Sequence, residues 1–256
     1  MKKTGLILSL LSVAMFGAAA QEIRITATAP LTEIYGEACE SDELLPMNEI
    51  GVDFGYALYE TQISVISDDA LLEIEHVRDY AAVYANGRLQ GTMTDGRKSL
   101  PLDLAPGDYT LQLYVENIGR ITYGPEILDN SKGVFGRATI DGKEVTGWRI
   151  IPLNVRECDV SALAFSPSAT VTTPSFHRGA FQTDSPTDVY LDMSGWGMGE
   201  VWLNGHYLGS FWEEEKQQSI LVSAELLKSG INEVVVFDLK RCGGGMLQLS
   251  SVPVFK

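Results

Sequence analysis

The chain has 256 residues, of which 45% are hydrophobic and 21% are charged, and its formal net charge is −15. This is the composition of a globular protein with a sizeable core, so a disordered chain is excluded. The negative charge repels phosphate backbones and anionic membranes, so neither nucleic acid nor a membrane surface is expected as a partner.

The first twenty residues have the pattern of a secretory signal peptide. Lys2 and Lys3 form a basic start, residues 5–17 are apolar but too few to span a bilayer comfortably, and small residues at 18–20 offer a cleavage site before Gln21. No cysteine follows that site, so a lipid anchor is not indicated. We expect an exported protein, periplasmic or extracellular, without a membrane span.

From Gln21 onward the sequence consists of short strand-like runs separated by turns. β-branched and aromatic residues alternate with polar ones, and Gly, Asn, Asp or Pro stands between the runs. The helical signal is weak. Short antiparallel strands at this spacing predict an all-β fold of jelly-roll or β-sandwich domains. The clearest runs are 23–27, 56–66, 81–84, 110–115, 189–193, 201–203, 219–222 and 233–239.

An internal repeat divides the chain into two parts. Residues 83–87 (VYANG), followed by Gly91, match residues 201–205 (VWLNG), followed by Gly209. Each Asn-Gly pair suits a type I′ hairpin turn, in which both central residues need positive φ. One domain length separates the copies, so we expect two β-domains and not a solenoid. The first covers residues 21–165 and the second covers residues 166–256, with strand 21–30 able to pair with the second domain.

Three cysteines, Cys39, Cys158 and Cys242, allow one disulfide and leave one thiol over. Which two pair stays open, as does calcium binding by a loop. The cysteines and the three histidines show no zinc-binding spacing, and no EF-hand series of ligands is present. We expect no metal site and no cofactor, and a fold that the core stabilises.

A series of motifs covers roughly residues 45–240. The motifs are FGYALYET (54–61), VRDYAAVYANG (77–87), VENIGRITYG (115–124), KGV (132–134), GW (147–148), PSFHRGAF (174–181), LDMSGW (191–196), VWLNGHYLGSFW (201–212) and VVVFDL (234–239). In this order the series resembles the C-terminal β-domains of family 35 glycoside hydrolases, the β-galactosidases. The resemblance implies two galactose-binding-like jelly rolls.

The chain also departs from that family. There, an (α/β)₈ barrel with both catalytic glutamates precedes these domains, whereas a signal peptide precedes them here. Glu60 and Ser210 stand where the family usually has arginine. The acidic run 213–215 suits a solvated turn better than the carboxylate pair, about 5–5.5 Å apart, of a retaining glycosidase. We therefore expect no catalytic residue and no enzyme activity.

Carbohydrate binding is the function that the residues favour. Sugar rings stack on Trp or Tyr, and polar side chains hydrogen-bond with the sugar hydroxyls, so such pockets combine an apolar wall with a few placed polar groups. We expect Trp196, flanked by glycines, and Tyr207, at a hairpin tip, to be exposed. Trp202 is expected in the core, and Trp212 could lie there too. The candidate sugar-binding residues are Trp196, Asn204, His206, Tyr207 and Trp212.

A second group of polar residues follows the strand 110–115. Glu116, Asn117, Arg120 and Tyr123 combine both signs of charge, an amide and a phenol in one loop. We expect Arg120 to pair with Asp79 and so to position the loop, because charged groups near a core need partners. The alternative is that the loop contacts a partner surface.

Three functions therefore remain. The first is an exported, non-catalytic module that binds galactose-containing or other glycans. The second is an accessory subunit that docks a separate glycoside hydrolase chain. The third and least favoured is a β-galactosidase-like hydrolase that acts alone.

Overall fold

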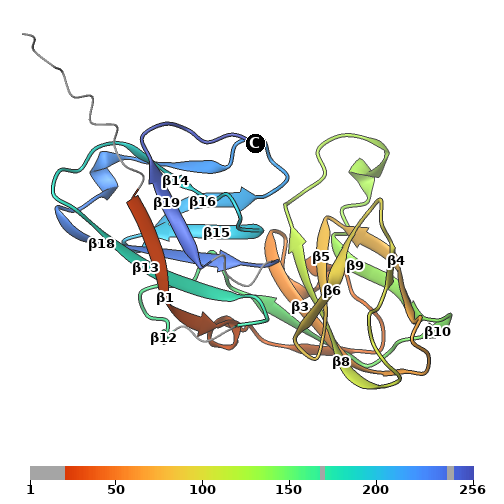
Figure 1. The fold of residues 1–256 in the computed structure, drawn as a ribbon. Helices are drawn as coiled ribbons and strands as arrows, with labels where there is room; N and C mark the ends of the chain where they lie inside the picture. The colour runs from red at the N-terminus through yellow and green to blue at the C-terminus, as the bar shows by residue number, and fades with distance from the viewer. Residues whose placement is uncertain (1–20, 168–170, 241–244) are drawn as a thin grey trace, which may run out of the picture.

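The computed structural model describes residues 21–167, 171–240 and 245–256, and over these residues the fold is all-β (Figure 1). The predicted fold class of two β-domains is confirmed. The signal-peptide segment and Cys242 lie outside the described residues. Within them no helix could span a bilayer. The helical turns are the 3₁₀ segments η1 (Leu31–Ile34), η2 (Met47–Ile50), η3 (Pro125–Leu128) and η4 (Ala224–Leu226).

The first domain is a sandwich of two antiparallel sheets. Six strands follow the order β2-β11-β3-β8-β5-β6, and four follow the order β10-β9-β4-β7. Tyr59, Leu72 and Trp148 are fully buried in the core between these sheets. The strands are β2 (Cys39–Ser41), β3 (Gly55–Val65), β4 (Leu71–Arg78), β5 (Tyr80–Ala85), β6 (Arg88–Thr94), β7 (Ser99–Pro101), β8 (Gly107–Asn117), β9 (Gly133–Ile140), β10 (Lys143–Glu144) and β11 (Trp148–Leu153).

The second domain is a single antiparallel sheet whose strands wrap around one hydrophobic core. The order is β16-β15-β18-β13-β1-β19-β14-β17, with β12 paired to β1. Strand β1 begins the described chain. Its first half pairs with β19 and its second half with β13, so it links β19-β14-β17 to β13-β18-β15-β16. The strands are β1 (Gln21–Pro30), β12 (Ser166–Pro167), β13 (Ser175–Thr183), β14 (Val189–Asp192), β15 (Met198–Leu203), β16 (His206–Trp212), β17 (Ser219–Val222), β18 (Gly230–Asp238) and β19 (Met246–Ser250).

The two repeat copies form equivalent hairpins, β5–β6 and β15–β16. Asn86 and Gly87 have φ values of 47° and 75°, and Asn204 and Gly205 have φ values of 51° and 82°. These positive values confirm the predicted type I′ turns, because both central residues of such a turn lie in the left-handed region. Each hairpin also has a register shift just after the valine that both repeat copies share, Val83 in the first and Val201 in the second.

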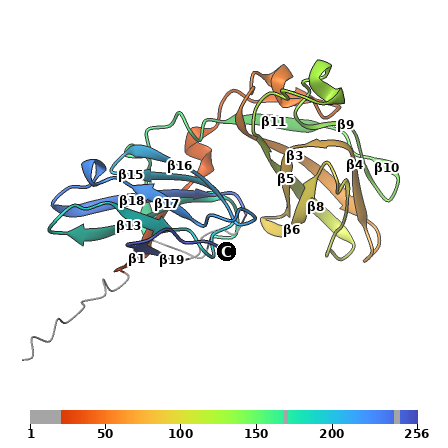
Figure 2. The same cartoon turned by 90° about the horizontal axis from the view of Figure 1, so that it is seen from above.

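The two domains share an apolar interface, which we call the seam. The first domain contributes side chains of β3, β5 and β8, and the second contributes side chains of β13, β15 and β18. The rings of Tyr56 and Phe237 meet edge to face across it, with centroids 5.1 Å apart. Figure 2 shows the two domains side by side. Each large buried side chain here stabilises the pairing by roughly 1.5–3 kcal/mol, so the seam fixes how the domains sit.

Candidate carbohydrate site

The edge strand β16 presents one of its faces toward the seam. Trp212, Ser210 and Tyr207 lie opposite Met198, Glu200 and Trp202 of β15, and cross-strand partners share a face of the sheet. Met198 and Trp202 are buried in the seam. On the outer strand, by contrast, Tyr207 is 45% exposed and Trp212 is 41% exposed. Two half-exposed aromatic side chains therefore lie on one face of one strand.

The Tyr207 side chain is held by contacts on its inner side. Its hydroxyl donates to Glu200 Oε2 at 2.6 Å, and its ring meets that of Trp202 edge to face at 5.7 Å. The Arg156 guanidinium lies 5.8 Å from the Tyr207 ring centroid and 4.1 Å from that of Phe54. Burial raises the pKa of the Tyr207 phenol well above its usual value, and the hydrogen bond to Glu200 adds to the rise. The phenol therefore stays protonated and its ring is fixed in place.

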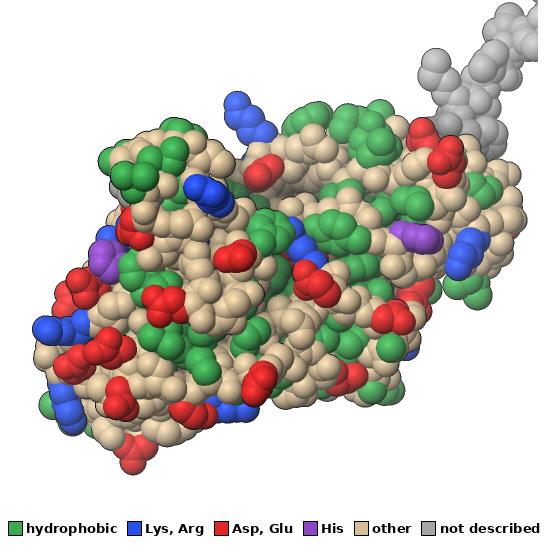
Figure 3. All heavy atoms as spheres, turned by 180° about the vertical axis from the view of Figure 1, so that it is seen from behind, with side chains coloured by type: hydrophobic (Ala, Val, Ile, Leu, Met, Phe, Trp, Pro, Cys, Tyr) green, Lys and Arg blue, Asp and Glu red, His purple; other side chains and the backbone are tan. Residues whose placement is uncertain are grey.

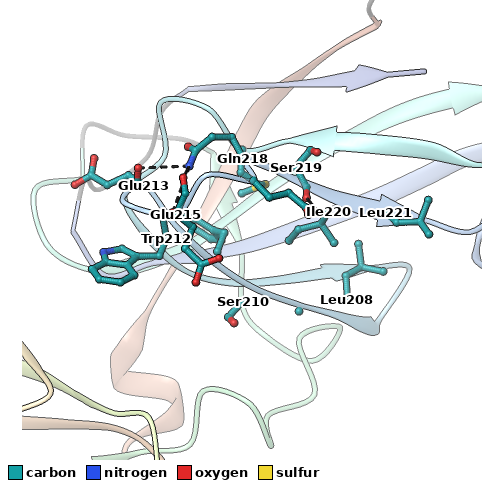
Figure 4. A pocket seen from close by; sticks show the side chains of 13 residues that line it. Leu208, Ser210, Trp212, Glu213, Glu215, Gln218, Ser219, Ile220 and Leu221 are labelled. Atoms are coloured by element: carbon teal, nitrogen blue, oxygen red, sulfur yellow. Dashed lines mark hydrogen bonds between the residues drawn. The ribbon is translucent and has the colours of Figure 1, made fainter. Parts of the chain in front are cut away.

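A pocket of about 300 Å³ lies between β16 and β17 (Figure 4), a volume at the lower end of those that hold small ligands. Its wall combines apolar side chains with a hydroxyl, carboxylates and amides. The Gln218 amide nitrogen donates to the backbone carbonyl oxygens of residues 212, 213 and 215 and so holds the turn beside the pocket. The side chains labelled in Figure 4 are those of Leu208, Ser210, Trp212, Glu213, Glu215, Gln218, Ser219, Ile220 and Leu221.

Beneath the face of β16, a buried polar cluster crosses the seam. Glu200 is 0% exposed and accepts hydrogen bonds from Tyr56 at 2.8 Å and from Arg156 Nε at 2.6 Å. The same Tyr56 hydroxyl lies 3.1 Å from Oε1 of Glu116, which is 6% exposed. This cluster joins the two domains through hydrogen bonds, because Tyr56 and Glu116 belong to the first domain and Glu200 to the second.

The Tyr56 hydroxyl has one proton and lies between two carboxyl groups, those of Glu200 and Glu116. Tyr56 donates to the closer oxygen, that of Glu200, which also contacts Arg156. A second hydrogen bond then requires a proton on Glu116, because an ionised carboxylate can only accept. Burial raises the pKa of Glu116 to about 7, and the nearby negative charge of Glu200 adds to the rise. Glu116 therefore holds a proton up to about neutral pH.

A loop of residues 118–132, which we call the β8–β9 loop, projects from the first domain next to the seam. Four of its apolar side chains are exposed, with Tyr123 at 85% and Leu128 at 96%. Figure 3 shows hydrophobic side chains on this projecting lobe and acidic side chains over much of the same view. This loop is a separate apolar surface from the face of β16. The four side chains are those of Ile118, Tyr123, Ile127 and Leu128.

Comparison with known families accounts for both domains. Residues 45–154 match the family model "Beta-galactosidase, first all-beta domain", and residues 174–232 match "Beta-galactosidase, galactose-binding domain". The chain belongs to the accessory β-domains of family 35 β-galactosidases. Both matched models are non-catalytic domains of this β-galactosidase family. The face of β16 lies in the galactose-binding domain, and the β8–β9 loop lies in the first all-beta domain.

Curated relatives of these β-galactosidase domains are whole proteins of greater length. A β-galactosidase from Xanthomonas manihotis is 35% identical over 206 residues, which are 76% of this chain and 34% of the relative. Beta-galactosidase-1-like protein 2 from Homo sapiens is 31% identical over 229 residues, which are 85% of this chain and 35% of the relative. The chain thus spans about a third of the length of the curated relatives it matches.

Among solved structures, the apo form of a Pleurotus ostreatus lectin aligns over 93% of this chain and 85% of the lectin. The sequence identity is 14% and the TM-score is 0.30. These values are too low to transfer a sugar site from the lectin to the galactose-binding domain.

The structure places the five predicted sugar-binding residues of the galactose-binding domain in different environments. Tyr207 and Trp212 share the exposed face described above. His206 is exposed, but it pairs with Leu203 and so lies on the other face of β16. Asn204 is half-buried in the hairpin turn, where it donates to Leu226 O and Asn232 Oδ1. Asn204 therefore fixes the turn and lies away from the exposed face.

The prediction that Trp196 is exposed is wrong. Trp196 is 1% exposed and packs in the core of the second domain. Its Nε1 donates to the backbone oxygen of Met246, 3.1 Å away. The turn after β14 folds inward and covers the core with the indole ring, so flanking glycines did not mean exposure. Trp202 is in the seam core, as predicted.

The predicted pairing of Arg120 with Asp79 is also wrong. The Asp79 carboxylate is bound by Lys132 Nζ at 2.5 Å and 2.7 Å and by the backbone amide of Ile118 at 2.9 Å. Arg120 is exposed, and no ion pair of the described residues includes it. Asn117 is buried, donating to Val52 O and accepting from the Gly119 amide. The β8–β9 loop is therefore anchored by Lys132 and Asn117.

Three residues of the site were not found from the sequence, namely Phe54, Arg156 and Glu200. A signal for Glu200 existed in the repeat, because its counterpart in the first copy is Ala82. A carboxylate at an inward-facing position that holds alanine in the other copy implies a buried polar partner. Arg156 gave no such signal, since it follows β11 in an irregular segment. Among the described residues, no group of His, Cys, Asp and Glu could hold a metal ion.

Proposed function

We propose that this chain is a carbohydrate-recognition module whose site is the face of β16 with the adjacent pocket. The observation that carries the proposal is the position of Trp212, which lines the pocket and is 41% exposed. The preceding residue of β16, Phe211, is buried. An exposed indole gives a sugar ring an apolar surface at low entropic cost, because the strand already fixes its backbone.

The pocket beside Trp212 supplies the polar half of the recognition. Ser210 offers a hydroxyl that both donates and accepts, and Glu215 offers a carboxylate that accepts hydrogen bonds from sugar hydroxyls. Leu208 and Leu221 provide apolar contact on the remaining wall. The family model named for galactose binding covers the same strands and supports a galactose-containing ligand.

The module acts without a glycosidase activity of its own and outside the cytoplasm. A buried pair of carboxyl groups, Glu116 and Glu200, shares the Tyr56 hydroxyl, but their exposed fractions of 6% and 0% leave no path for a glycosidic bond. The signal-peptide pattern of residues 1–20 supports the location.

Isothermal titration calorimetry of residues 21–256 with galactose and with galactobiose tests the proposal. Trp212→Ala should lower the affinity by about tenfold or more, because truncating an aromatic anchor costs on the order of 2 kcal/mol. Tyr123→Ala is the matched control, since it removes an exposed aromatic ring in the other domain. An aryl-galactoside assay on the same sample should show no turnover. Equal affinity of Trp212→Ala and the wild type would reject the site.

A second function is favoured by the β8–β9 loop. Ile118, Tyr123, Ile127 and Leu128 expose apolar side chains on one projecting lobe, and such a patch marks a protein-binding surface. The partner of this second function is a separate glycoside hydrolase chain. Sedimentation of the protein with an isolated catalytic barrel of a family 35 enzyme should show a complex that Leu128→Asp disrupts and Trp212→Ala does not. Absence of a complex with the wild type rejects this function.

A further inference from the structure

The two exposed aromatic side chains on β16 are too far apart for one sugar ring. Their partners on β15, Trp202 and Met198, are four residues apart. At about 3.3 Å per residue, this places Tyr207 and Trp212 about 13 Å apart along the strand. One pyranose ring stacks on one aromatic ring, so a single sugar can occupy only one of the two positions.

The surface between these two side chains is open and polar. Ser210 lies between them on the same face and is exposed. Below it, Glu200 is taken up by Tyr56, Arg156 and Tyr207. The Ser210 hydroxyl is thus the group on this face that can reach a ligand bridging the two rings.

The Tyr207 side chain is held in a fixed orientation at one end of this face. Its hydroxyl is turned inward to Glu200, so the exposed part of the side chain is the ring. Trp202 on one side and Arg156 on another restrict rotation of the ring. Beyond Arg156, the Phe54 ring of the first domain is 47% exposed and continues the apolar surface across the seam.

The charges around the face disfavour an anionic ligand. Arg156 is paired with Glu200 and Lys240 is paired with Glu213, so the carboxylates take up both of these cations. At the Trp212 end Glu215 and Lys216 are both exposed and Lys256 is paired with Glu214, so the excess negative charge is that of the whole chain, formally −15. A neutral chain of sugars avoids this repulsion, whereas a uronic-acid chain does not.

We propose that the site takes an extended, neutral oligosaccharide that lies along β16 and stacks on both Trp212 and Tyr207, with Phe54 as a third contact for longer chains. This inference rests on the proposed carbohydrate-binding function of the same face. It assigns the ligand class as a neutral oligosaccharide of several sugars and not a single galactose.

Calorimetric titration with β-1,4-linked galactose oligomers of one to four units tests the inference. Affinity should rise by about tenfold between the monosaccharide and the tetrasaccharide, since the second stacked ring adds on the order of 1.4 kcal/mol. Tyr207→Ala should remove this rise, whereas Trp212→Ala should weaken the binding of every length. Tyr207→Phe keeps the ring and should keep most of the rise. Oligogalacturonates of equal length should bind more weakly at low salt.

The outcomes separate the inference from the proposed function. If galactose binds as tightly as the tetrasaccharide, or if Tyr207→Ala leaves the rise intact in a protein with a wild-type circular dichroism spectrum, the extended site is overturned while the function stands. If oligogalacturonates bind more tightly than the neutral oligomers, the neutral ligand class is overturned. If no sugar of any length binds, the proposed function itself fails.

Discussion

The hairpins β5–β6 and β15–β16 have the same backbone but different chemistry. Both turn at Asn-Gly, both carry a register shift after valine, and in both the asparagine Oδ1 accepts a backbone N–H from a neighbouring strand, that of Thr110 or of Glu233. The seam face of β5 holds Tyr80, Ala82 and Tyr84, whereas that of β15 holds Met198, Glu200 and Trp202.

The outer strands of the two hairpins, β6 and β16, also carry different side chains. The cross-strand partners of these seam-facing residues are Leu89, Thr92 and Thr94 on β6. On β16 they are Tyr207, Ser210 and Trp212. The shared residues are therefore those that the turn and the ladder require. The residues that differ include a buried carboxylate and two exposed aromatic side chains, which a hairpin does not need and which a ligand site does.

The largest effect is expected from making β15 like β5 with Glu200→Ala. The substitution leaves Arg156 without its buried carboxylate, leaves the Tyr207 hydroxyl without its acceptor, and leaves the Tyr56 hydroxyl with Glu116 as its remaining carboxyl partner. Removing one partner of a buried ion pair costs about 3–5 kcal/mol of unfolding free energy. Urea unfolding measures it, with the exposed Glu214→Ala as a control that should change stability by less than about 0.5 kcal/mol. A loss below about 1 kcal/mol for Glu200→Ala would mean that the cluster does not join the domains.

The next largest effect is the pH dependence of the unfolding free energy that comes from Glu116, the carboxyl group near Glu200 across the seam. The pKa of Glu116 is raised from 4.5 to about 7, so between these values the folded state binds more protons than the unfolded state. Stability from this group is therefore full below pH 4.5 and is lost as pH rises to about 7, a change of about 3 kcal/mol. Glu116→Gln mimics the protonated form and should remove this part of the pH dependence.

The difference in unfolding free energy between the wild type and Glu116→Gln, measured by urea unfolding from pH 4.5 to 8, isolates that contribution. It cancels the opposite dependence of exposed carboxyl groups such as Asp129, whose pKa is lowered by hydrogen bonds from Ser131. A difference that stays constant with pH would show that Glu116 does not hold the proton.

A smaller difference separates the two turn asparagines. Asn86→Ala and Asn204→Ala both place alanine at positive φ and both lose the bond to a strand amide. Asn204 loses two further bonds, to Leu226 O and Asn232 Oδ1, so its substitution should cost about 2 kcal/mol more. Thermal unfolding of the two variants gives the comparison. Equal losses would mean that these two bonds add nothing to the second hairpin.

The smallest effect on stability is expected for Trp212→Thr, which gives β16 the residue that β6 has at the equivalent position, Thr94. The side chain is 41% exposed and the rest of its surface is buried, so the unfolding free energy should fall by roughly 1–2 kcal/mol. The affinity for galactobiose, measured by calorimetry, should nevertheless fall by about tenfold or more, as for Trp212→Ala. A large loss of stability would instead make Trp212 a structural residue.

Local patterns were enough to predict the strands, the two-domain organisation and both Asn-Gly turns. Alternation of side chains depends on the period of a strand, and the turn depends on two adjacent residues, so neither needs knowledge of distant contacts. Tyr207 lies next to such a turn, and its exposure followed from that place.

The environment of Trp196 and the partner of Asp79 depend on segments far along the chain. Trp196 is buried in the core of the second domain and donates to the backbone oxygen of Met246, and Asp79 is neutralised by Lys132, 53 positions away. Glycines beside a tryptophan describe only the local backbone, and several cations can reach one carboxylate. For the same reason Arg156 and Phe54, which meet at the seam from different segments, were not predicted.

The most direct test of the account is a crystal structure of residues 21–256 with β-1,4-linked galactotetraose. The account predicts sugar rings stacked on Trp212 and Tyr207, with the chain running along β16. Ordered sugar on the equivalent face of β6, on the β8–β9 loop, or elsewhere with Trp212 unoccupied would contradict it.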